Sequence, residues 1–257
     1  MVSIHKQEEL IFEKCQALLG DGGEVSADGL HYLGEFYYEK GYWKRKPGNE
    51  ERDWKLYCAR KRGLVILTKD LNDEEAWDIR EEHGRKNEVE EPTPSNCGFY
   101  RNLRRWIYGL LSMNNEGLMP EFPATYIAQE CFERKPWVRM NLKKIPGSSS
   151  ISNQELNKNI QDFRSLLLEQ LVIYKDASIY LDCTHRHGIK LLRENLYSDI
   201  KAFGAGEDDW IYFSEEQHFF IVNSYHPSYC IPGGEEAYYD RMKDAIHSFF
   251  QEYPTFL

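Results

Sequence analysis

The stretch Gly63-Leu64-Val65-Ile66-Leu67-Thr68 decides the class of fold. Its four consecutive apolar residues, 64–67, form a run of strand length between a basic cluster and a polar, acidic loop. A continuous apolar run, unlike an alternating one, is typical of a strand buried on both faces, as strands of parallel sheets are. The sequence therefore predicts that a central strand of an α/β sheet begins here.

Three further apolar runs follow, with helical segments between them. The runs cover residues 137–140, 177–181 and 219–222, and the helical patterns cover about 99–112, 153–173, 187–196 and 235–251. Strands separated by helices need crossover connections, which give parallel pairing. Residues 210–213 and 218–222, separated by Ser-Glu-Glu-Gln, predict a hairpin. We expect a three-layer α/β fold with a four-stranded, mostly parallel sheet flanked by helices.

The chain before residue 63 has a different pattern. Residues 4–19 and 27–40 read as two helices, each followed by a glycine, Gly20 or Gly41, that would end it. We therefore expect a helical extension over residues 1–62, packed on a main domain over residues 63–257. The basic residues between 44 and 62 would either follow a nucleic-acid backbone or form a solvated helix face balanced by nearby acids.

Composition narrows the class of protein further. The 257 residues are 41% hydrophobic and 29% charged, which excludes a disordered chain. The formal charge is -10, with a pI near 5.4, which argues against a surface coated with phosphate-binding residues but leaves room for a local basic groove. No segment has the apolar length of a signal peptide or a membrane span, so we expect a cytoplasmic protein with no membrane partner.

Six cysteines are scattered singly through the chain. None forms a C-x-x-C pair. This spacing favours reduced thiols over a disulfide framework, and we expect no iron–sulfur cluster.

Polar residues follow three of the predicted strands, at 68–73, 141–147 and 223–228. Ligands of open parallel sheets bind beyond the carboxyl ends of the strands, where these loops converge. A carboxylate, an amide and an imidazole are therefore expected to meet in one cleft.

The order of these segments resembles the uracil-DNA glycosylase superfamily. The resemblance covers roughly residues 63–250 and is sharpest at Asn141, at the helix that follows it, and at His226-Pro227-Ser228. It implies that family's four-stranded parallel sheet flanked by helices. It also implies base flipping and hydrolysis of the N-glycosidic bond of uracil or another damaged base in DNA, as in DNA repair.

The resemblance also implies roles for individual residues. Asp70 would assist the attacking water, Asn141 would read the base, and His226 would stabilise the departing base anion. Ser228 would contact the phosphate backbone, and Phe99 or Tyr100 would stack on the base. The partner would be DNA or another ligand that contains a nucleobase, and the reaction would need no metal or organic cofactor.

Two other hypotheses stay open. Thr68 and Leu71 occupy places where active relatives have glycine and proline, which favours a catalytically inactive fold that binds a nucleotide, nucleic acid or protein partner. With an offset of two or three residues, Asn72 or Asp73 would replace Asp70. A metal hydrolase would instead use Cys183, His185 and His187, whose side chains are competent ligands for zinc.

Overall fold

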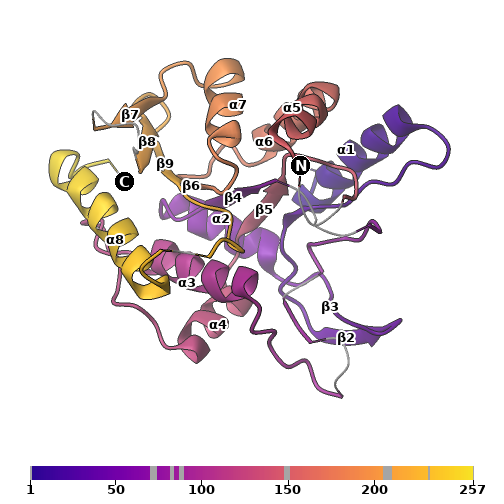
Figure 1. Cartoon of the computed structure of the whole chain (residues 1–257), viewed down its shortest axis with the longest axis horizontal. Coiled ribbons are helices and arrows are strands. Elements are labelled where there is room, and N and C mark those ends of the chain that lie inside the picture. Colours follow the sequence, from indigo (N-terminus) through magenta and orange to yellow (C-terminus); the bar gives the residue numbers. More distant parts are fainter. Residues whose placement is uncertain are drawn as a thin grey trace.

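The computed structural model describes residues 2–69, 74–81, 84–86, 90–147, 151–204, 210–230 and 232–256. Within these residues a seven-stranded sheet lies between two layers of helices (Figure 1). Across the sheet the strands are β1 (Gly29–Leu30), β5 (Val138–Asn141), β4 (Leu64–Thr68), β6 (Ile179–Asp182), β9 (Phe219–Asn223), β8 (Ile211–Ser214) and β7 (Lys201–Phe203).

The four strands at the centre, β5, β4, β6 and β9, pair in parallel. They are the four apolar runs read from the sequence, so the prediction of a mostly parallel α/β sheet is confirmed. The predicted sheet size of four strands is wrong. The antiparallel strands β8 and β7 extend one edge, and β1 pairs antiparallel with β5 at the other. The predicted hairpin is confirmed as β8 and β9.

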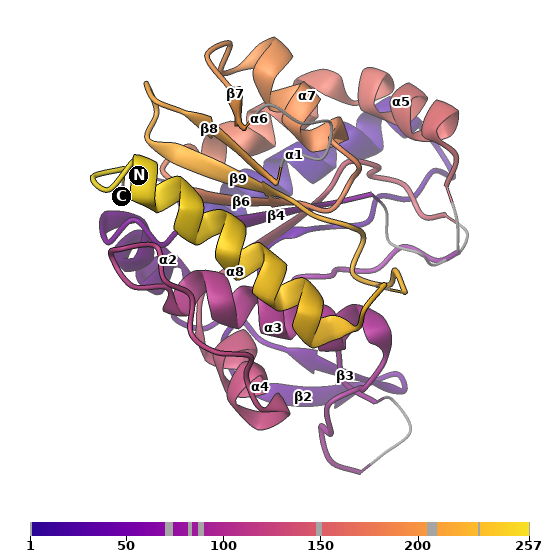
Figure 2. The same cartoon turned by 60° about the vertical axis from the view of Figure 1, so that its left-hand side comes forward.

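Helices cover both faces of the sheet (Figure 2). One face carries α3 (Gly98–Ser112), α4 (Thr125–Arg134) and α8 (Glu235–Glu252), and the other carries α1 (Ile4–Leu19), α5 (Asn153–Asp162), α6 (Arg164–Ile173) and α7 (His187–Asn195). Strand β4 serves both cores because its side chains alternate: Leu64 and Ile66 join the first core, and Val65 and Leu67 join the second. This burial on both faces explains the unbroken apolar run.

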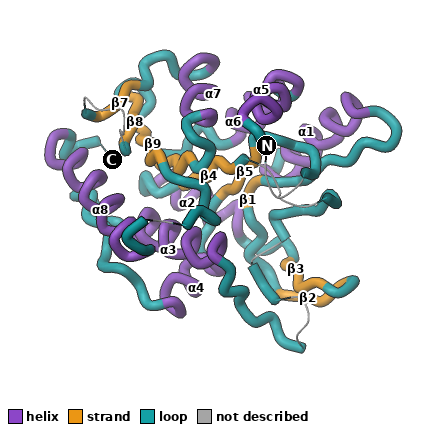
Figure 3. Tube along the Cα trace, viewed as in Figure 1, coloured by secondary structure: helices purple, strands orange, loops and turns teal. Residues whose placement is uncertain are grey.

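The N-terminal part differs from its prediction. The helix expected at 4–19 is confirmed as α1, and the Ser3 side chain caps it by accepting from the backbone N–H of Lys6. The helix expected over 27–40 is wrong, because that segment contains β1 and β2 (Phe36–Glu39). Strand β2 pairs with β3 (Tyr42–Arg45) around a two-residue turn (Figure 3). Lys40 and Gly41 both have positive φ there, so Gly41 belongs to a hairpin turn rather than to a helix end.

The N-terminal segment also shares the second core. Ile4, Ile11, Leu30 and Trp54, the last from α2 (Glu50–Ala59), are buried with residues of β4 and β5. The boundary after residue 62, between an N-terminal extension and a main domain, stays a prediction. The long helix expected at 153–173 is divided at Phe163 into α5 and α6, and α4 had not been expected.

Candidate functional site

The carboxyl ends of the parallel strands bring polar residues to one edge of the sheet. Thr68 of β4 lies opposite Asn141 of β5, and Asp182 of β6 lies opposite Asn223 of β9. Backbone hydrogen bonds between the two chain segments continue beyond the ends of β4 and β5. The N–H of Leu142 donates to the carbonyl of Thr68, and the N–H of Lys143 donates to the carbonyl of Lys69. The expected convergence of strand ends is therefore present in the described residues.

Asn141 is held firmly at the end of β5. Its side chain is fully buried, and its Oδ1 accepts a hydrogen bond from the Thr68 hydroxyl. Its backbone N–H donates to Oδ2 of Asp28 at 2.7 Å. Its Nδ2 is buried and has no hydrogen-bond partner among the described residues, although buried polar groups are nearly always paired. Asn141 therefore has one fixed acceptor and one buried donor without a partner.

Arg139 lies two residues before Asn141 on the same strand. Because side chains alternate along a strand, both are on the same face of β5. Arg139 is buried, its Nε donates to the Thr68 hydroxyl at 3.4 Å, and its guanidinium lies 4.7 Å from the centre of the Phe99 ring. A buried cation thus lies beside the amide, stacked on an aromatic ring of α3.

His226 reaches the same place from the loop after β9. Its ring centre lies 5.6 Å from that of Phe99. The backbone N–H of Ser228 donates to Nδ1 of His226 at 3.4 Å. A neutral imidazole has one acceptor and one donor nitrogen, so a ring that accepts at Nδ1 carries its hydrogen at Nε2. This loop therefore fixes the tautomer of His226 and leaves Nε2–H as the donor.

The surroundings keep His226 uncharged. Burial is the largest cause that lowers its pKa, and together with the positive charges of Arg139 and Lys69 and the nearby His185 it brings the pKa to about 4. Burial and the charge of Lys69 also lower the pKa of His185 and of His187. The strand ends therefore form a local positive site in a chain whose net charge is -10. Such a site favours an anionic ligand or a developing negative charge.

The other sequence-predicted residues lie as follows. Asp70, Asn72 and Asp73 fall outside the described residues. Tyr100 does not follow Phe99 toward His226. It packs instead against Phe132, with ring centres 6.2 Å apart, and against the backbone of Gly84. Ser228 is exposed, and its backbone supports His226.

The buried carboxylate at these strand ends has a local structural role. Both oxygens of Asp182 accept hydrogen bonds, one from the backbone and hydroxyl of Thr184 and the other from the N–H of Ile189 at the start of α7. Burial raises the pKa of Asp182, although these hydrogen bonds lower it. The Thr184 hydroxyl in turn accepts from the N–H of Gly188. Asp182 and Thr184 therefore cap α7.

The geometry gives the metal hypothesis no support. Cys183 is fully buried in the core beneath α3 and α8, and burial raises the pKa of its thiol well above the ordinary value. Among the residues that the structure describes, no three His, Cys, Asp or Glu side chains are grouped as metal ligands.

Sequence reasoning missed Arg139, Lys69 and His185 as members of this site. Arg139 had one visible signal, a charged residue within an otherwise apolar run at 137–140. A charge placed within a buried strand needs a partner or a function, because its burial is costly. Lys69 had no comparable signal, because basic residues are common in exposed loops, and His185 had been considered only as a metal ligand.

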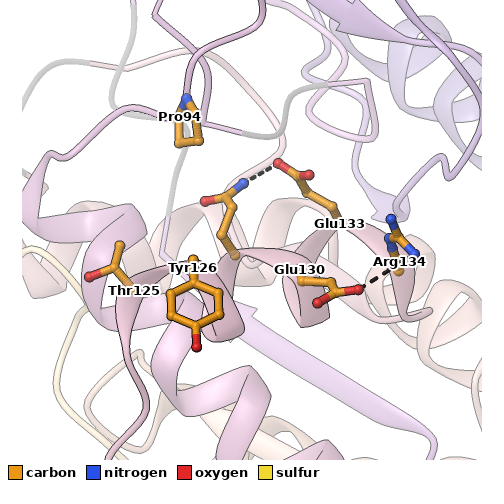
Figure 4. Close-up of a pocket in the computed structure, with 7 residues that line it drawn as sticks. Pro94, Thr125, Tyr126, Glu130, Glu133 and Arg134 are labelled. Carbon is orange, nitrogen blue, oxygen red and sulfur yellow. Dashed lines mark hydrogen bonds and ion pairs between the residues drawn. The ribbon is translucent and has the colours of Figure 1, made fainter.

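The cavities at the surface of the described residues include the following two. One, of about 680 Å³, extends along α4 and has none of the strand-end residues in its wall. Figure 4 shows its side chains, including the ion pair between Glu130 and Arg134. The other, of about 330 Å³, is lined by His185 and by residues on either side of the β9 end. Neither of these two cavities has Asn141 or Arg139 among its described lining residues. Because Asn141 is fully buried, a base reaches it only if neighbouring side chains move.

The fold and these residues together define an α/β protein whose parallel strand ends carry a buried amide, a neutral imidazole and a buried arginine. No protein-family model matches the chain, and a search of curated proteins finds no match. In the part of the chain that the structure describes, no helix combines the length and apolar character needed to cross a membrane.

Proposed function

We propose that this protein hydrolyses the N-glycosidic bond of uracil or another damaged base in DNA. One observation carries the proposal: a neutral His226, with Nε2–H as its donor, lies among positive charges at the strand ends that also hold Asn141. The resemblance of residues 141 and 226–228 to the uracil-DNA glycosylase superfamily adds to it.

His226 would act as a hydrogen-bond donor to the leaving base. When the bond between C1′ and the base nitrogen breaks, the electron pair goes to the base and its carbonyl oxygens gain negative charge. A neutral imidazole with a fixed Nε2–H stabilises that charge without transferring its proton. The positive charges of Arg139 and Lys69 favour the same anion, and water then adds to C1′ and loses a proton.

Asn141 would select the base. Its amide offers an acceptor at Oδ1, already engaged by Thr68, and a donor at Nδ2 that lacks a partner. An amide of this kind pairs with a carbonyl of the base edge. Because Asn141 is fully buried, a base that reaches it must displace neighbours, and Arg139 and Phe99 are the side chains in position to move. Phe99 would then stack on the base, a role that Tyr100 does not share.

Asp70 stays the proposed residue for assisting the attacking water. It follows Lys69 directly in the sequence, two residues after the last residue of β4, Thr68. The fully buried Asp182 is unsuited to this role because both of its oxygens are used to cap α7.

A second candidate function is binding without catalysis, with a nucleotide as ligand. The buried position of Asn141, and the presence of Arg139 beside it, favour this candidate. A buried guanidinium is well suited to a phosphate, whereas a base-reading amide needs open space beside it.

Excision assays would test the proposal. Single- and double-stranded oligonucleotides containing uracil, hypoxanthine or a mismatch would be incubated with the protein and with the variants Asp70→Asn, Asn141→Asp and His226→Gln. We expect excision by the wild type and a loss of at least about 100-fold in each variant, the size typical of removing one transition-state donor or catalytic group. Two matched controls, Asn157→Asp on the exposed side of α5 and His247→Gln on α8, are expected to retain activity.

The outcomes separate the two candidates. Absence of excision by folded wild-type protein at stoichiometric concentration would contradict the hydrolase. Tight binding of a nucleotide, weakened by Arg139→Gln, would then establish the binding function.

A further inference from the structure

The cavity of about 330 Å³ lies directly beside His226 but has different chemistry from the strand-end site. It lies between the turn before α7, the end of β9, the residue before β8, and α8. Its lining residues are His185, Arg186, Trp210, Asn223, Ser224, Tyr225, Tyr238 and Arg241. Its volume lies at the lower end of the range of small-molecule sites, roughly 300–1,000 Å³.

Two arginines are among the residues that line this cavity. Arg241 and Arg186 come from different elements, α8 and the turn before α7. The guanidinium of Arg241 lies 5.7 Å from the centre of the Tyr238 ring, and its Nη2 donates to the carbonyl of Pro232 at 3.2 Å. None of the described lining residues is acidic. Glu207, Asp208 and Asp209 precede Trp210 in the sequence and lie outside the described residues.

Aromatic rings also line the cavity. The Tyr238 ring centre lies 5.1 Å from that of Trp210 and 5.7 Å from that of Tyr225. The hydroxyls of Tyr238 and Ser224 are joined by a hydrogen bond of 2.8 Å. The Tyr238 hydroxyl also accepts from the backbone N–H of Tyr225 at 3.2 Å. These contacts fix the aromatic wall in place. Tyr225 is 40% exposed, so one ring of the wall faces solvent.

A cavity lined by both cations and aromatic rings matches a ligand with an anionic group and a flat ring. Arginine pairs with phosphate through its planar fork of donors, and bases stack on aromatic side chains. We propose that this cavity binds a nucleoside monophosphate unit, with its phosphate on Arg186 and Arg241 and its base against Trp210 and Tyr225.

The position of the cavity indicates which nucleotide would occupy it. Tyr225 directly precedes His226, and His185 both lines the cavity and helps to lower the pKa of His226. A unit bound here is therefore next to the one at the strand ends. This part of the inference rests on the proposed function: the occupant is the nucleotide that neighbours the one being hydrolysed in the same strand.

Calorimetric titration of the full chain would test the site. The probes are thymidine 5′-monophosphate, thymidine, inorganic phosphate and a thymidine trinucleotide. We expect the monophosphate to bind more tightly than thymidine or phosphate alone, and the trinucleotide to bind more tightly still if the site serves a strand. Arg241→Gln is expected to weaken monophosphate binding at least about tenfold, the loss of one charge-assisted contact.

Two variants serve as controls. Lys190→Gln removes an exposed cation of α7 that pairs with Glu194, and it is expected to leave binding unchanged. Asn157→Asp changes an exposed amide of α5, away from the cavity lining, and is also expected to leave monophosphate binding unchanged. Thermal unfolding of each variant would verify that it is folded.

The results distinguish the two proposals. Absence of monophosphate binding, or equal binding by Arg241→Gln, overturns the cavity site even where the protein excises bases. Binding that depends on Arg241, together with absence of excision, supports the cavity and overturns the hydrolase. Equal affinity for the monophosphate and the trinucleotide overturns the assignment to a strand and leaves a site for a free nucleotide.

Discussion

Asp28 and Asn141 are joined by a hydrogen bond of 2.7 Å, from the Asn141 backbone N–H to Oδ2 of the carboxylate. Asp28 comes from the N-terminal segment and Asn141 from the end of β5. The same carboxylate accepts from Nζ of Lys144 at 2.8 and 2.6 Å and from Nε2 of Gln170 at 2.7 Å. Asp28 and Lys144 are both fully buried. The N-terminal segment thus helps to hold Asn141, the proposed base reader, in position.

The first prediction concerns this buried pair. Asp28→Asn keeps the shape of the side chain but leaves the charge of Lys144 buried without its counterion. Breaking a buried ion pair from one side costs about 3–5 kcal/mol, so we expect a loss of that order in the free energy of unfolding, measured with urea. Lys14→Gln is the control, because it removes an exposed pair with Glu169 and is expected to cost less than about 1 kcal/mol. Similar losses in both variants would show that the buried pair contributes no more to stability than the exposed pair does.

The second prediction concerns the charge state of His226. Its pKa of about 4, compared with an ordinary value of 6.5, means that the ring is neutral through most of the acidic range. Titration followed by NMR should show this value, and Arg139→Gln should raise it by removing a positive charge. A ring that titrates near 6.5 in the wild type would contradict the proposed donor state.

The same shift predicts a dependence of stability on pH. Below pH 6.5 the unfolded chain takes up a proton at His226 before the folded chain does. The free energy of unfolding should therefore fall as the pH is lowered from 6.5 to 4. His226→Gln should reduce this dependence. If the free energy of unfolding, measured with urea, did not change between pH 6.5 and 4 in either protein, the lowered pKa of His226 would be contradicted.

The third prediction concerns His5, which joins Glu8 and Glu50. Burial lowers its pKa, but hydrogen bonds to Glu50 and Glu8, at 2.9 Å each, and the charges of both carboxylates raise it to about 9. A raised pKa in the folded state contributes stability that is complete below pH 6.5. That stability is lost as the pH rises through 9, and it amounts to roughly 3 kcal/mol. His5→Gln should flatten the curve of unfolding free energy between pH 6.5 and 9. A wild-type curve that is already flat would count against the charged bridge.

The fourth prediction concerns Gly84. Its φ is +62°, and a Cβ there would lie 2.4 Å from the Tyr100 ring. Gly84→Ala should therefore destabilise the protein by about 1–3 kcal/mol, through both the backbone conformation and the clash. Gly98→Ala is the matched control, because Gly98 has open space around it at the start of α3 and should be neutral or slightly stabilising. Equal melting temperatures of the two variants would contradict the tight contact between Tyr100 and Gly84.

Much of the fold was predictable because it is encoded locally. The apolar run at 64–67 identified β4, and similar runs identified β5, β6 and β9, because a strand buried on both faces shows no polar alternation. The addition of short strands at the two edges of the sheet was not predictable in the same way. Strand β1 has two residues, and β7 has three, so their pairing depends on neighbours rather than on their own pattern.

The candidate site divides in the same manner. The polar residues after the strands, among them Asn141 and His226, were visible because they interrupt or follow apolar runs. The stacking of Arg139 on Phe99, and the turn of Tyr100 away from Phe99, were not visible. Neighbouring residues of a helix point about 100° apart, and only the surroundings decide which of them faces the site.

The sequence by itself determined that this chain forms a mostly parallel α/β sheet with polar strand ends, since burial and turn chemistry are properties of short segments. Only the tertiary structure decided that Asp28 pairs with Lys144, 116 residues away, and that burial beside Arg139 and Lys69 holds His226 neutral. Those relationships depend on the order of strands in the sheet and on the paths of the loops. Contacts between residues distant in the chain set them, and no local pattern of residues records such contacts.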